Sequence, residues 1–192
     1  MTADEEHIEG QVIDEELDPE REARRRIALA QIRQYPDAAL KMKARPVEDF
    51  DDELKNLVER MKLLMVDAAG IGLAATQVGV LRRVFVFQNE DDELLAIVNP
   101  DIVERSEGTE VADEGCLSIQ RITVPVERSL EVKIVGKDEN GEDVHYELDG
   151  YVARCVQHET DHLDGILFFD RKTSLESLTF LDEYSRFWRQ ET

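Results

Sequence analysis

The chain has 192 residues, of which 42% are hydrophobic, and this is enough for one domain with its own core. Its formal net charge of −21 argues against direct DNA binding and against attraction to anionic membranes, because both need clustered Lys and Arg. Two cysteines and no long apolar run indicate a reducing, cytoplasmic location and exclude a disulfide scaffold or a membrane helix.

The first twenty residues are rich in acidic side chains and contain no Lys or Arg. Low hydrophobicity with high charge predicts an acidic, disordered arm over residues 1–26, followed by a single domain over residues 27–192. The basic run 21–26 leads into the apolar segment 27–32, which could form a short helix. The arginines of that run either balance the acidic arm, which we favour, or bind RNA.

Residues 51–69 carry apolar side chains at helical spacing and predict an amphipathic helix. Residues 174–190 predict a second one, with mixed charges, that packs on its own domain. Between them lie four β-prone segments, the last two joined by the hairpin signal Asn140-Gly141: Arg83–Gln88, Leu94–Asn99, Leu130–Val135 and Val144–Leu148. The expected fold is α+β, with strands around a central buried helix and a C-terminal amphipathic helix.

The most specific pattern is the sequence HETDH at residues 158–162. Residues four apart lie on one face of a helix, so His158 and His162 can bind one metal ion. Glu159 is turned to the side of that ligand line, where a general base for water activated by the metal belongs. Asp149 is a plausible N-cap, and Gly165 suits the left-handed position after the helix. The alternative is a solvated charged face, but apolar neighbours predict a buried helix, where two histidines are costly unless something binds them.

A hydrolytic metal site needs about three protein ligands and one open position. One known spacing requires a third histidine where this chain has Phe168, so that pattern is excluded. Glu183 stands about twenty residues downstream, as in some metallopeptidases, but it falls in a segment that looks built for packing. We favour Cys116, because a thiolate is a strong, soft ligand and the preceding Gly115 permits an unusual backbone angle or a close approach. Cys155 has apolar neighbours and is expected to be a small buried hydrophobe.

Residues 70–80 (GIGLAATQVGV) form a stretch of small residues that can pack tightly and leave room for a ligand. Gln77 is a long amide among apolar residues, so a buried Gln77 must find hydrogen-bond partners. One use of its N–H₂ group is to stabilise a developing oxyanion. The alternative is a glycine-rich turn that enters a strand, whereas a nucleotide-binding loop is excluded by the missing Lys and the wrong spacing.

Three blocks resemble, in their order and separation, the three motifs of bacterial peptide deformylase: GIGLAATQ at 70–77, EGCLS at 114–118 and QHETDHLDG at 157–165. The resemblance extends from residue 32 to residue 171. It implies a cytoplasmic, metal-dependent hydrolase that removes the N-formyl group from the initiator methionine of nascent polypeptides. It also implies that Cys116, His158 and His162 hold one divalent metal ion, which is usually Fe(II), with Zn, Ni or Co as other occupants.

By the same resemblance, Glu159 is the general base and then the acid, while the Gln77 side chain and the Leu117 backbone N–H stabilise the oxyanion. Ile71 and Gly72 bind the peptide backbone as an added strand. The pocket for the methionine side chain is expected beside Tyr151, Arg154 and Cys155, with the stem of Arg154 along its wall and its charged head in water. The implied substrate-binding residues are Ile71, Gly72, Gly115, Tyr151, Arg154 and Cys155.

Gln120 and Thr123 depart from the family pattern, which often has a proline and an arginine at these positions, so the substrate contacts there are in question. Arg121 is a possible substitute. We also expect Arg128 to pair with Glu114 and to orient the cysteine loop.

Some relatives dock on the ribosome through a basic C-terminal helix. Residues 174–190 lack that excess of basic side chains, so the sequence does not decide whether this chain makes a transient contact with the ribosome. Two other functions also stay open. One is a metallopeptidase with His158, His162 and Glu183 as ligands, and the other is a non-catalytic relative that binds metal or peptide.

Overall fold

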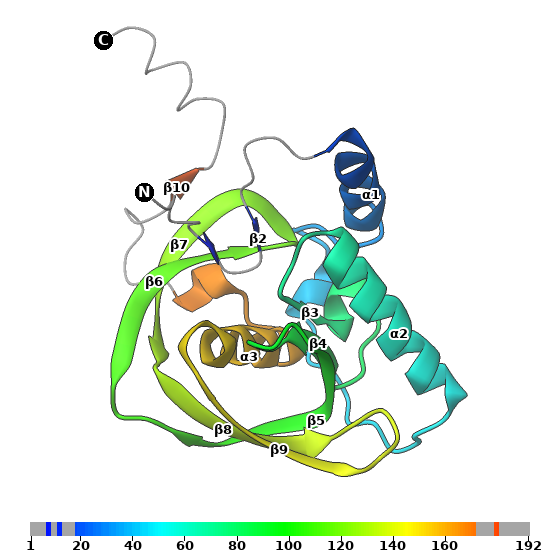
Figure 1. The fold of residues 1–192 in the computed structure, drawn as a ribbon, viewed down its shortest axis with the longest axis vertical. Helices are drawn as coiled ribbons and strands as arrows, with labels where there is room; N and C mark the ends of the chain where they lie inside the picture. The colour runs from blue at the N-terminus through cyan, green and yellow to red at the C-terminus, as the bar shows by residue number, and fades with distance from the viewer. Residues whose placement is uncertain (1–6, 9–10, 13–17, 172–178, 181–192) are drawn as a thin grey trace, which may run out of the picture.

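The computed structural model describes residues 7–8, 11–12, 18–171 and 179–180, and it confirms an α+β fold. Helix α3 (Gly150–Leu163) lies at the centre, and strands of two antiparallel sheets surround it (Figure 1). Asp149 occupies the N-cap position of α3, but its side chain makes no capping hydrogen bond. Gly165 follows the helix with φ +74°, as the sequence predicts, and a Cβ there would lie 2.6 Å from the Lys41 carbonyl oxygen.

The larger sheet has five antiparallel strands in the order β3-β4-β5-β8-β9. The four predicted strand segments all fall within it, and Gly141 in the β8–β9 turn has φ +86°, a value that favours glycine. The strands are β3 (Gly72–Ala74), β4 (Val84–Gln88), β5 (Leu94–Arg105), β8 (Glu131–Lys137) and β9 (Asp143–Asp149).

The smaller sheet has the order β10-β7-β6, with β6 at Thr109–Cys116, β7 at Ile119–Ser129 and β10 at Thr179–Phe180. The β6–β7 ladder shifts register between Glu114 and Cys116, at Gly115. The sequence predicts that residues 179 and 180 belong to a C-terminal helix. Instead they form a strand that pairs with β7, because the edge of β7 offers unpaired backbone groups. The rest of the predicted 174–190 helix lies outside the described residues.

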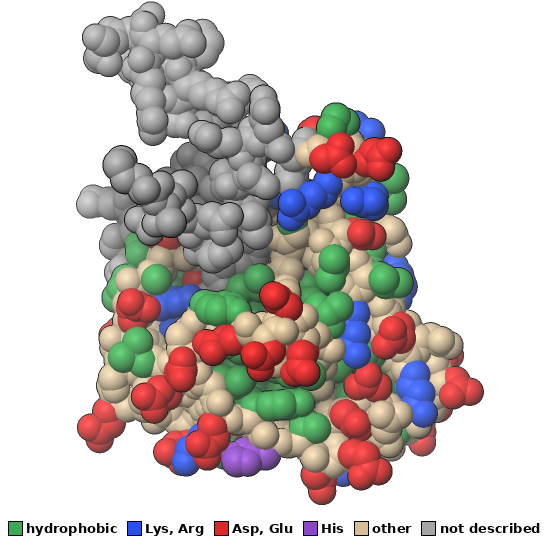
Figure 2. Space-filling view, viewed as in Figure 1, with side chains coloured by type: hydrophobic (Ala, Val, Ile, Leu, Met, Phe, Trp, Pro, Cys, Tyr) green, Lys and Arg blue, Asp and Glu red, His purple; other side chains and the backbone are tan. Residues whose placement is uncertain are grey.

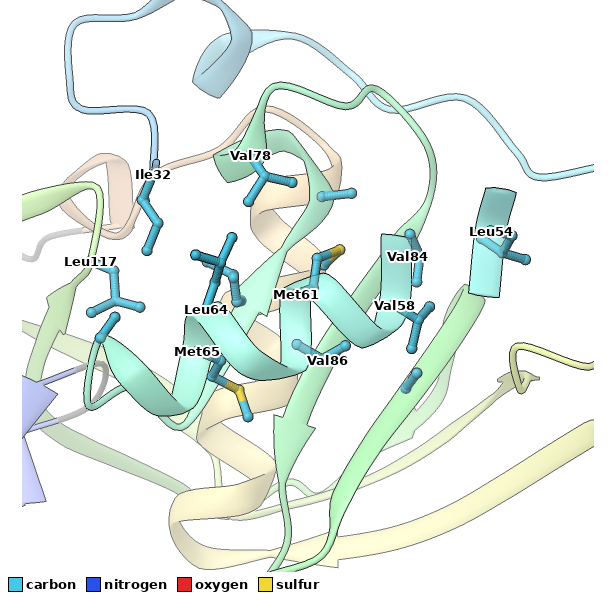
Figure 3. Packing of buried hydrophobic residues seen from close by; sticks show 14 of the residues in the cluster. Ile32, Leu54, Val58, Met61, Leu64, Met65, Val78, Val84, Val86 and Leu117 are labelled. Atoms are coloured by element: carbon cyan, nitrogen blue, oxygen red, sulfur yellow. The ribbon is translucent and has the colours of Figure 1, made fainter. Parts of the chain in front are cut away.

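Helix α2 (Asp52–Asp67) matches the predicted amphipathic helix. The Asp51 carboxylate accepts a hydrogen bond from the backbone N–H of Leu54 at 2.9 Å and so caps the first turn. One face of the helix is buried against the larger sheet (Figure 3). The buried side chains of this face are Leu54, Val58, Met61, Leu64 and Met65.

Strand β4 separates two cores because successive side chains of a strand point to opposite faces. Val84 and Val86 pack in the cluster that contains α2, whereas Phe85 and Phe87 pack in the cluster that contains α3. A third cluster lies around β6 and β7 and includes Cys116. The central helix is therefore packed on the larger sheet, while the cysteine belongs to the smaller one.

Helix α1 (Pro19–Leu29) starts inside the range 1–26 that was expected to be an arm, with Asp18 at its N-cap. Strands β1 (His7–Ile8) and β2 (Gln11–Val12) pair with each other. The division into an arm over 1–26 and a domain over 27–192 stays a prediction. Three short 3₁₀ helices complete the described elements: η1 (Ala38–Lys41), η2 (Ala75–Val78) and η3 (Phe168–Arg171).

None of the helices in the described ranges has the length and apolar character needed to span a bilayer. Figure 2 shows many acidic side chains on the face that Figure 1 views, in keeping with the net charge of −21.

Candidate metal centre

Three buried side chains from two elements converge in the middle of the molecule. Cys116 comes from the end of β6, and His158 and His162 come from one face of α3. One donor atom of each lies within 4.8 Å of the other two, and Cys116 Sγ is 3.3 Å from His162 Nε2. A tetrahedral metal holds sulfur and nitrogen ligands roughly 3.5 Å apart. The donor set predicted from the sequence therefore fits one metal ion of the zinc or iron type.

Glu159 is buried beside these three side chains, against Gly72 of β3. Its Oε2 atom has no hydrogen-bond partner among the described residues. Burial raises the pKa of its carboxyl group to about 7, despite the opposing effect of His158. A buried carboxyl group with one unoccupied oxygen and such a pKa can take up or release a proton near neutral pH.

Gln77 is buried and bridges β3 and the cysteine loop. Its Oε1 accepts a hydrogen bond from the Ala74 backbone N–H at 2.8 Å. Its Nε2 lies 3.1 Å from Ser118 Oγ and 3.6 Å from Cys116 Sγ. The side-chain N–H₂ group thus points toward the cysteine loop. Ser118 has no role in the sequence motif, although its hydroxyl, two residues after Cys116, is well placed to fix that amide.

Two glycines allow the loop before Gln77 to approach the centre. A Cβ on Gly70 would lie 2.7 Å from Leu117 Cδ1, and one on Gly72 would lie 2.5 Å from Glu159 Oε1 and 2.7 Å from Cys155 Sγ. These distances are shorter than real Cβ contacts, so any larger residue must displace its neighbour. The small residues of this stretch therefore have a packing role at the centre itself.

Glu114 is a fully buried carboxylate behind the ligands. Arg128 binds it with two hydrogen bonds, of 2.8 Å to Oε1 and 2.9 Å to Oε2, which confirms the predicted pair. His158 Nδ1 lies 3.0 Å from Oε2. Burial would raise the pKa of Glu114, but the contacts with Arg128 and His158 outweigh it and hold that pKa well below its usual range.

The ionised state of Glu114 sets the tautomer of His158. An ionised carboxylate can only accept hydrogen bonds, so the His158 ring donates from Nδ1, and Nε2 is the nitrogen left for a metal. Burial lowers the pKa of His158, but the contacts with Cys116 and Glu114 outweigh burial and raise that pKa well above its usual value, so a metal at Nε2 would displace a proton. For His162, burial and then the neighbouring His158 lower the pKa well below its usual value, which keeps that ring neutral as a metal ligand requires.

The guanidinium group of Arg154 does not lie in water, where it was expected. Arg154 is buried, and its guanidinium group binds Glu114 and two backbone carbonyl groups, so the expectation that its head stays in water is wrong. The reason is that Glu114 on β6 is a buried carboxylate, and a buried charge needs partners. A guanidinium group in water would leave Glu114 with one partner fewer.

Two other implied substrate residues of α3, Cys155 and Tyr151, contact segments near β3 and β4 rather than the smaller sheet. Cys155 Sγ is 3.5 Å from the Ile71 carbonyl oxygen. Tyr151 is exposed at the start of the helix, and its hydroxyl donates to the Asn89 carbonyl oxygen at 3.4 Å. Gly115 is buried at the register shift of β6, which re-aims the strand just before Cys116, and it does not adopt a positive φ.

The two departures from the family pattern differ in exposure. Gln120 is exposed and its amide donates to the Gln34 side chain at 3.1 Å. Thr123 is buried in β7 opposite Thr179. Arg121, the possible substitute, has φ +64°. Glu183, the ligand expected for a metallopeptidase, lies outside the described residues.

Comparison with known proteins decides the family. The model of the family "Polypeptide deformylase" matches residues 29–178. The chain belongs to the polypeptide deformylase family. Its members are metal-dependent enzymes that remove N-formyl groups from nascent peptides, and the chain is accordingly a deformylating hydrolase of protein biosynthesis.

The similarity to individual deformylases covers most of both chains. The peptide deformylase of Thermotoga sp. (strain RQ2) is 47% identical over 140 residues, which are 73% of this chain and 85% of the relative. That of Thermodesulfovibrio yellowstonii is 39% identical over 162 residues, or 82% of this chain and 98% of the relative.

Solved deformylase structures share the fold. The crystal structure of the Thermotoga maritima enzyme matches with a TM-score of 0.72 at 45% identity, and the match covers 74% of this chain and 97% of that one. The structure of the Synechococcus elongatus enzyme in complex with actinonin matches with a TM-score of 0.73 at 40% identity, and the match covers 76% and 80% of the two chains.

The buried pairing of Arg128 leads to a first prediction. Arg128→Ala removes one partner of Glu114, which keeps Arg154 and His158, and one partner of Asp161, which keeps Arg171. Breaking a buried ion pair costs about 3–5 kcal/mol. We expect the free energy of unfolding in urea to fall by that amount and both metal content and activity to fall with it. Arg82→Ala, which breaks the exposed pair with Glu53, is the control and should change stability by less than about 1 kcal/mol. Unchanged metal content and activity in Arg128→Ala would show that the pair does not orient the cysteine loop.

The contact of Gly72 leads to a second prediction. Gly72→Ala places a methyl group 2.5 Å from Glu159 Oε1, so the carboxylate must move. A misplacement of about 1 Å can cost about 100-fold in rate, and we expect kcat on a formyl-methionyl peptide to fall by about that factor. Gly108→Ala is the matched control, because its Cβ meets only Leu130 Cδ1 at 3.2 Å. Equal rates for the two variants would mean that Gly72 does not set the position of Glu159.

Proposed function

We propose that Cys116, His158 and His162 hold the metal ion on which this deformylase depends, and that the ion in the cell is Fe(II). Zn, Ni and Co suit the same donors, because one thiolate and two imidazoles bind each of these ions. When bound, the ion acts as a Lewis acid that lowers the pKa of water and polarises the formyl oxygen. The convergence of the three donor atoms next to the unpartnered oxygen of Glu159 carries this proposal.

Glu159 takes the proton of the attacking water and later delivers it to the amine that leaves. Its burial supports this role, because a pKa of about 7 suits proton transfer in both directions. Formate and a free N-terminus are the products. The Gln77 side-chain amide and the Leu117 backbone N–H stabilise the oxygen that becomes negative. The short approach of Gln77 Nε2 to Cys116 supports its part in this.

The formylated peptide binds as a strand between the two sheets. In the described part of the chain, β3 is an edge strand of the larger sheet and β6 is an edge strand of the smaller one. Edge strands offer unpaired backbone groups, so a peptide can pair with Ile71 and Gly72 on one side and reach Gly115 on the other. Tyr151 and Cys155 line the pocket for the methionine side chain, next to Ile71.

The partner is the N-formylmethionyl end of a nascent polypeptide in the cytoplasm. A transient contact with the ribosome is part of this proposal, since the substrate emerges there. Helix α1 carries four arginines at positions 21, 24, 25 and 26, and of these Arg25 binds the Ala68 carbonyl oxygen at 3.2 Å through Nε.

A formate-release assay tests the function. Metal-loaded protein, kept free of oxygen, is given a formyl-methionyl tripeptide, with the acetyl-methionyl tripeptide as the matched substrate control. We expect formate from the first, no acetate from the second, and loss of turnover after a chelator removes the metal. Cleavage of internal peptide bonds without formate release would instead support a metallopeptidase, and metal binding without turnover would support a non-catalytic relative.

A further inference from the structure

The proposed metal ligands come from two parts of the molecule whose buried apolar residues, among those described, fall in separate clusters. The apolar residues of α3, among them Val152 and Val156, pack in the cluster of the larger sheet. Cys116 packs with Val124 and Val126 in the cluster of the smaller sheet. Hydrophobic packing is non-directional, so these two clusters do not by themselves set the distance between a sulfur atom and two ring nitrogens.

A buried arginine connects the two parts. Arg154 belongs to α3, but its guanidinium group forms hydrogen bonds and an ion pair with the smaller sheet. Nη1 donates to Glu114 Oε1 at 3.0 Å and to the Val126 carbonyl oxygen at 2.9 Å, and Nη2 donates to the Glu110 carbonyl oxygen at 3.0 Å. A guanidinium group is a rigid planar fork, so three acceptors on β6 and β7 fix the orientation of that sheet relative to the helix.

Glu114, which Arg154 binds, also belongs to a closed ring of contacts that includes a second arginine, Arg128. From α3, His158 binds Glu114 on β6, Glu114 binds Arg128 on β7, and Arg128 Nη1 donates to Asp161 Oδ2 at 2.6 Å, back on α3. Asp161 lies directly before His162 in the helix, and Glu114 lies two residues before Cys116. The ring thus contacts α3 next to His162 and contacts β6 two residues before Cys116.

We propose that Arg154 is a positioning residue that docks β6 onto α3 and so sets the distance between Cys116 and the two histidines. It is not part of the wall of the methionine pocket. Loss of its three hydrogen bonds releases Glu114 from one of its partners and lets the end of β6 move away from the helix. This inference rests on the proposed ligand set.

Cobalt(II) binding tests the inference directly, because a thiolate bound to cobalt gives a charge-transfer absorption band that imidazole ligands do not give. The metal-free full-length chain is titrated with Co²⁺ as the wild type, R154M and R154K, with R82M as a control that breaks only the exposed pair with Glu53. Methionine keeps the length of the side chain without donors, whereas lysine keeps the charge and part of the hydrogen bonding. The melting temperature of each metal-free protein and the kcat and KM for formyl-methionyl and formyl-norleucyl peptides are measured on the same samples.

We expect R154M to bind Co²⁺ about tenfold more weakly and to lose much of the charge-transfer band, since partners behind metal ligands commonly contribute about 10- to 100-fold in affinity. R154K should recover part of both, and R82M should match the wild type. KM ratios between the two peptides should stay unchanged.

Three results would overturn the inference. An unchanged band and affinity in R154M, with only a lower melting temperature, would leave Arg154 a purely structural residue. An altered preference between the two peptides with normal Co²⁺ binding would return it to the substrate pocket. If R154M does not fold, R154K decides, and wild-type affinity with a wild-type band in R154K would also refute the role. A wild type that lacks the thiolate band altogether would refute the proposed ligand set instead, so the two failures are distinguishable.

Discussion

Replacing Glu159 with glutamine is expected to lower kcat for formate release by about 10²- to 10⁴-fold, the usual contribution of a general acid–base group. The amide keeps the volume of the side chain but cannot take a proton from water. The carboxylate is buried against β3, and its Oε2 has no partner among the described residues, so its removal leaves no other group unpaired at that atom. Stability should therefore change little.

The measurement pairs initial rates of formate release with the metal content of the same samples. Metal content should remain at the wild-type level, because Glu159 is not among the three converging donors. Thr160, the next residue, bonds within its own helix through Oγ1 to the Val156 carbonyl oxygen, so Thr160→Ser is a conservative control that should retain activity. A Glu159→Gln protein that loads metal normally and turns over near the wild-type rate would remove Glu159 from the mechanism.

Replacing Cys116 with serine is expected to weaken metal binding by about 100-fold or more. A hydroxyl group is a poor ligand for the metals that a thiolate and two imidazoles prefer, and it is not ionised near neutral pH. The two histidines alone leave a metal with too few protein ligands for a stable site. Activity should fall in proportion to the loss of metal.

Metal content after dialysis, measured by elemental analysis, checks this prediction, and the second cysteine supplies the control. Cys155 is equally buried, but its sulfur contacts the Ile71 carbonyl oxygen. Cys155→Ala should therefore keep its metal. If Cys116→Ser retained a full equivalent of metal, a ligand set of His158, His162 and a residue such as Glu183 would become the better explanation.

Short-range patterns account for the parts of the site that the sequence already predicts. The i, i+4 histidines depend only on helical geometry, and the glutamate between them takes its position from the same helix. The alternating and helical hydrophobic patterns likewise predict α2, α3 and four of the five strands of the larger sheet, β4, β5, β8 and β9, because each element needs one face or both faces buried. They do not predict the short strand β3. Gly165 and Gly141 have positive φ at the predicted helix end and hairpin turn.

Long-range contacts account for what the sequence did not predict. The position of Thr179 and Phe180 in a strand depends on the free edge of β7, which no local pattern of residues 174–190 reveals. The position of Arg154 is a second case. Its neighbours in the helix suggest a pocket wall with a solvated head, but the partners that hold the head come from β6 and β7.

The sequence by itself determined, through three motifs in the right order, which family the chain belongs to, and it predicted the three side chains that converge in the structure. Only the tertiary structure decided how Cys116 is held against the two histidines, because a buried ring of charges between α3, β6 and β7 supplies that geometry. Buried charges must find partners wherever the fold provides them, and those partners are far apart along the chain. Local periodicity carries no information about such pairs.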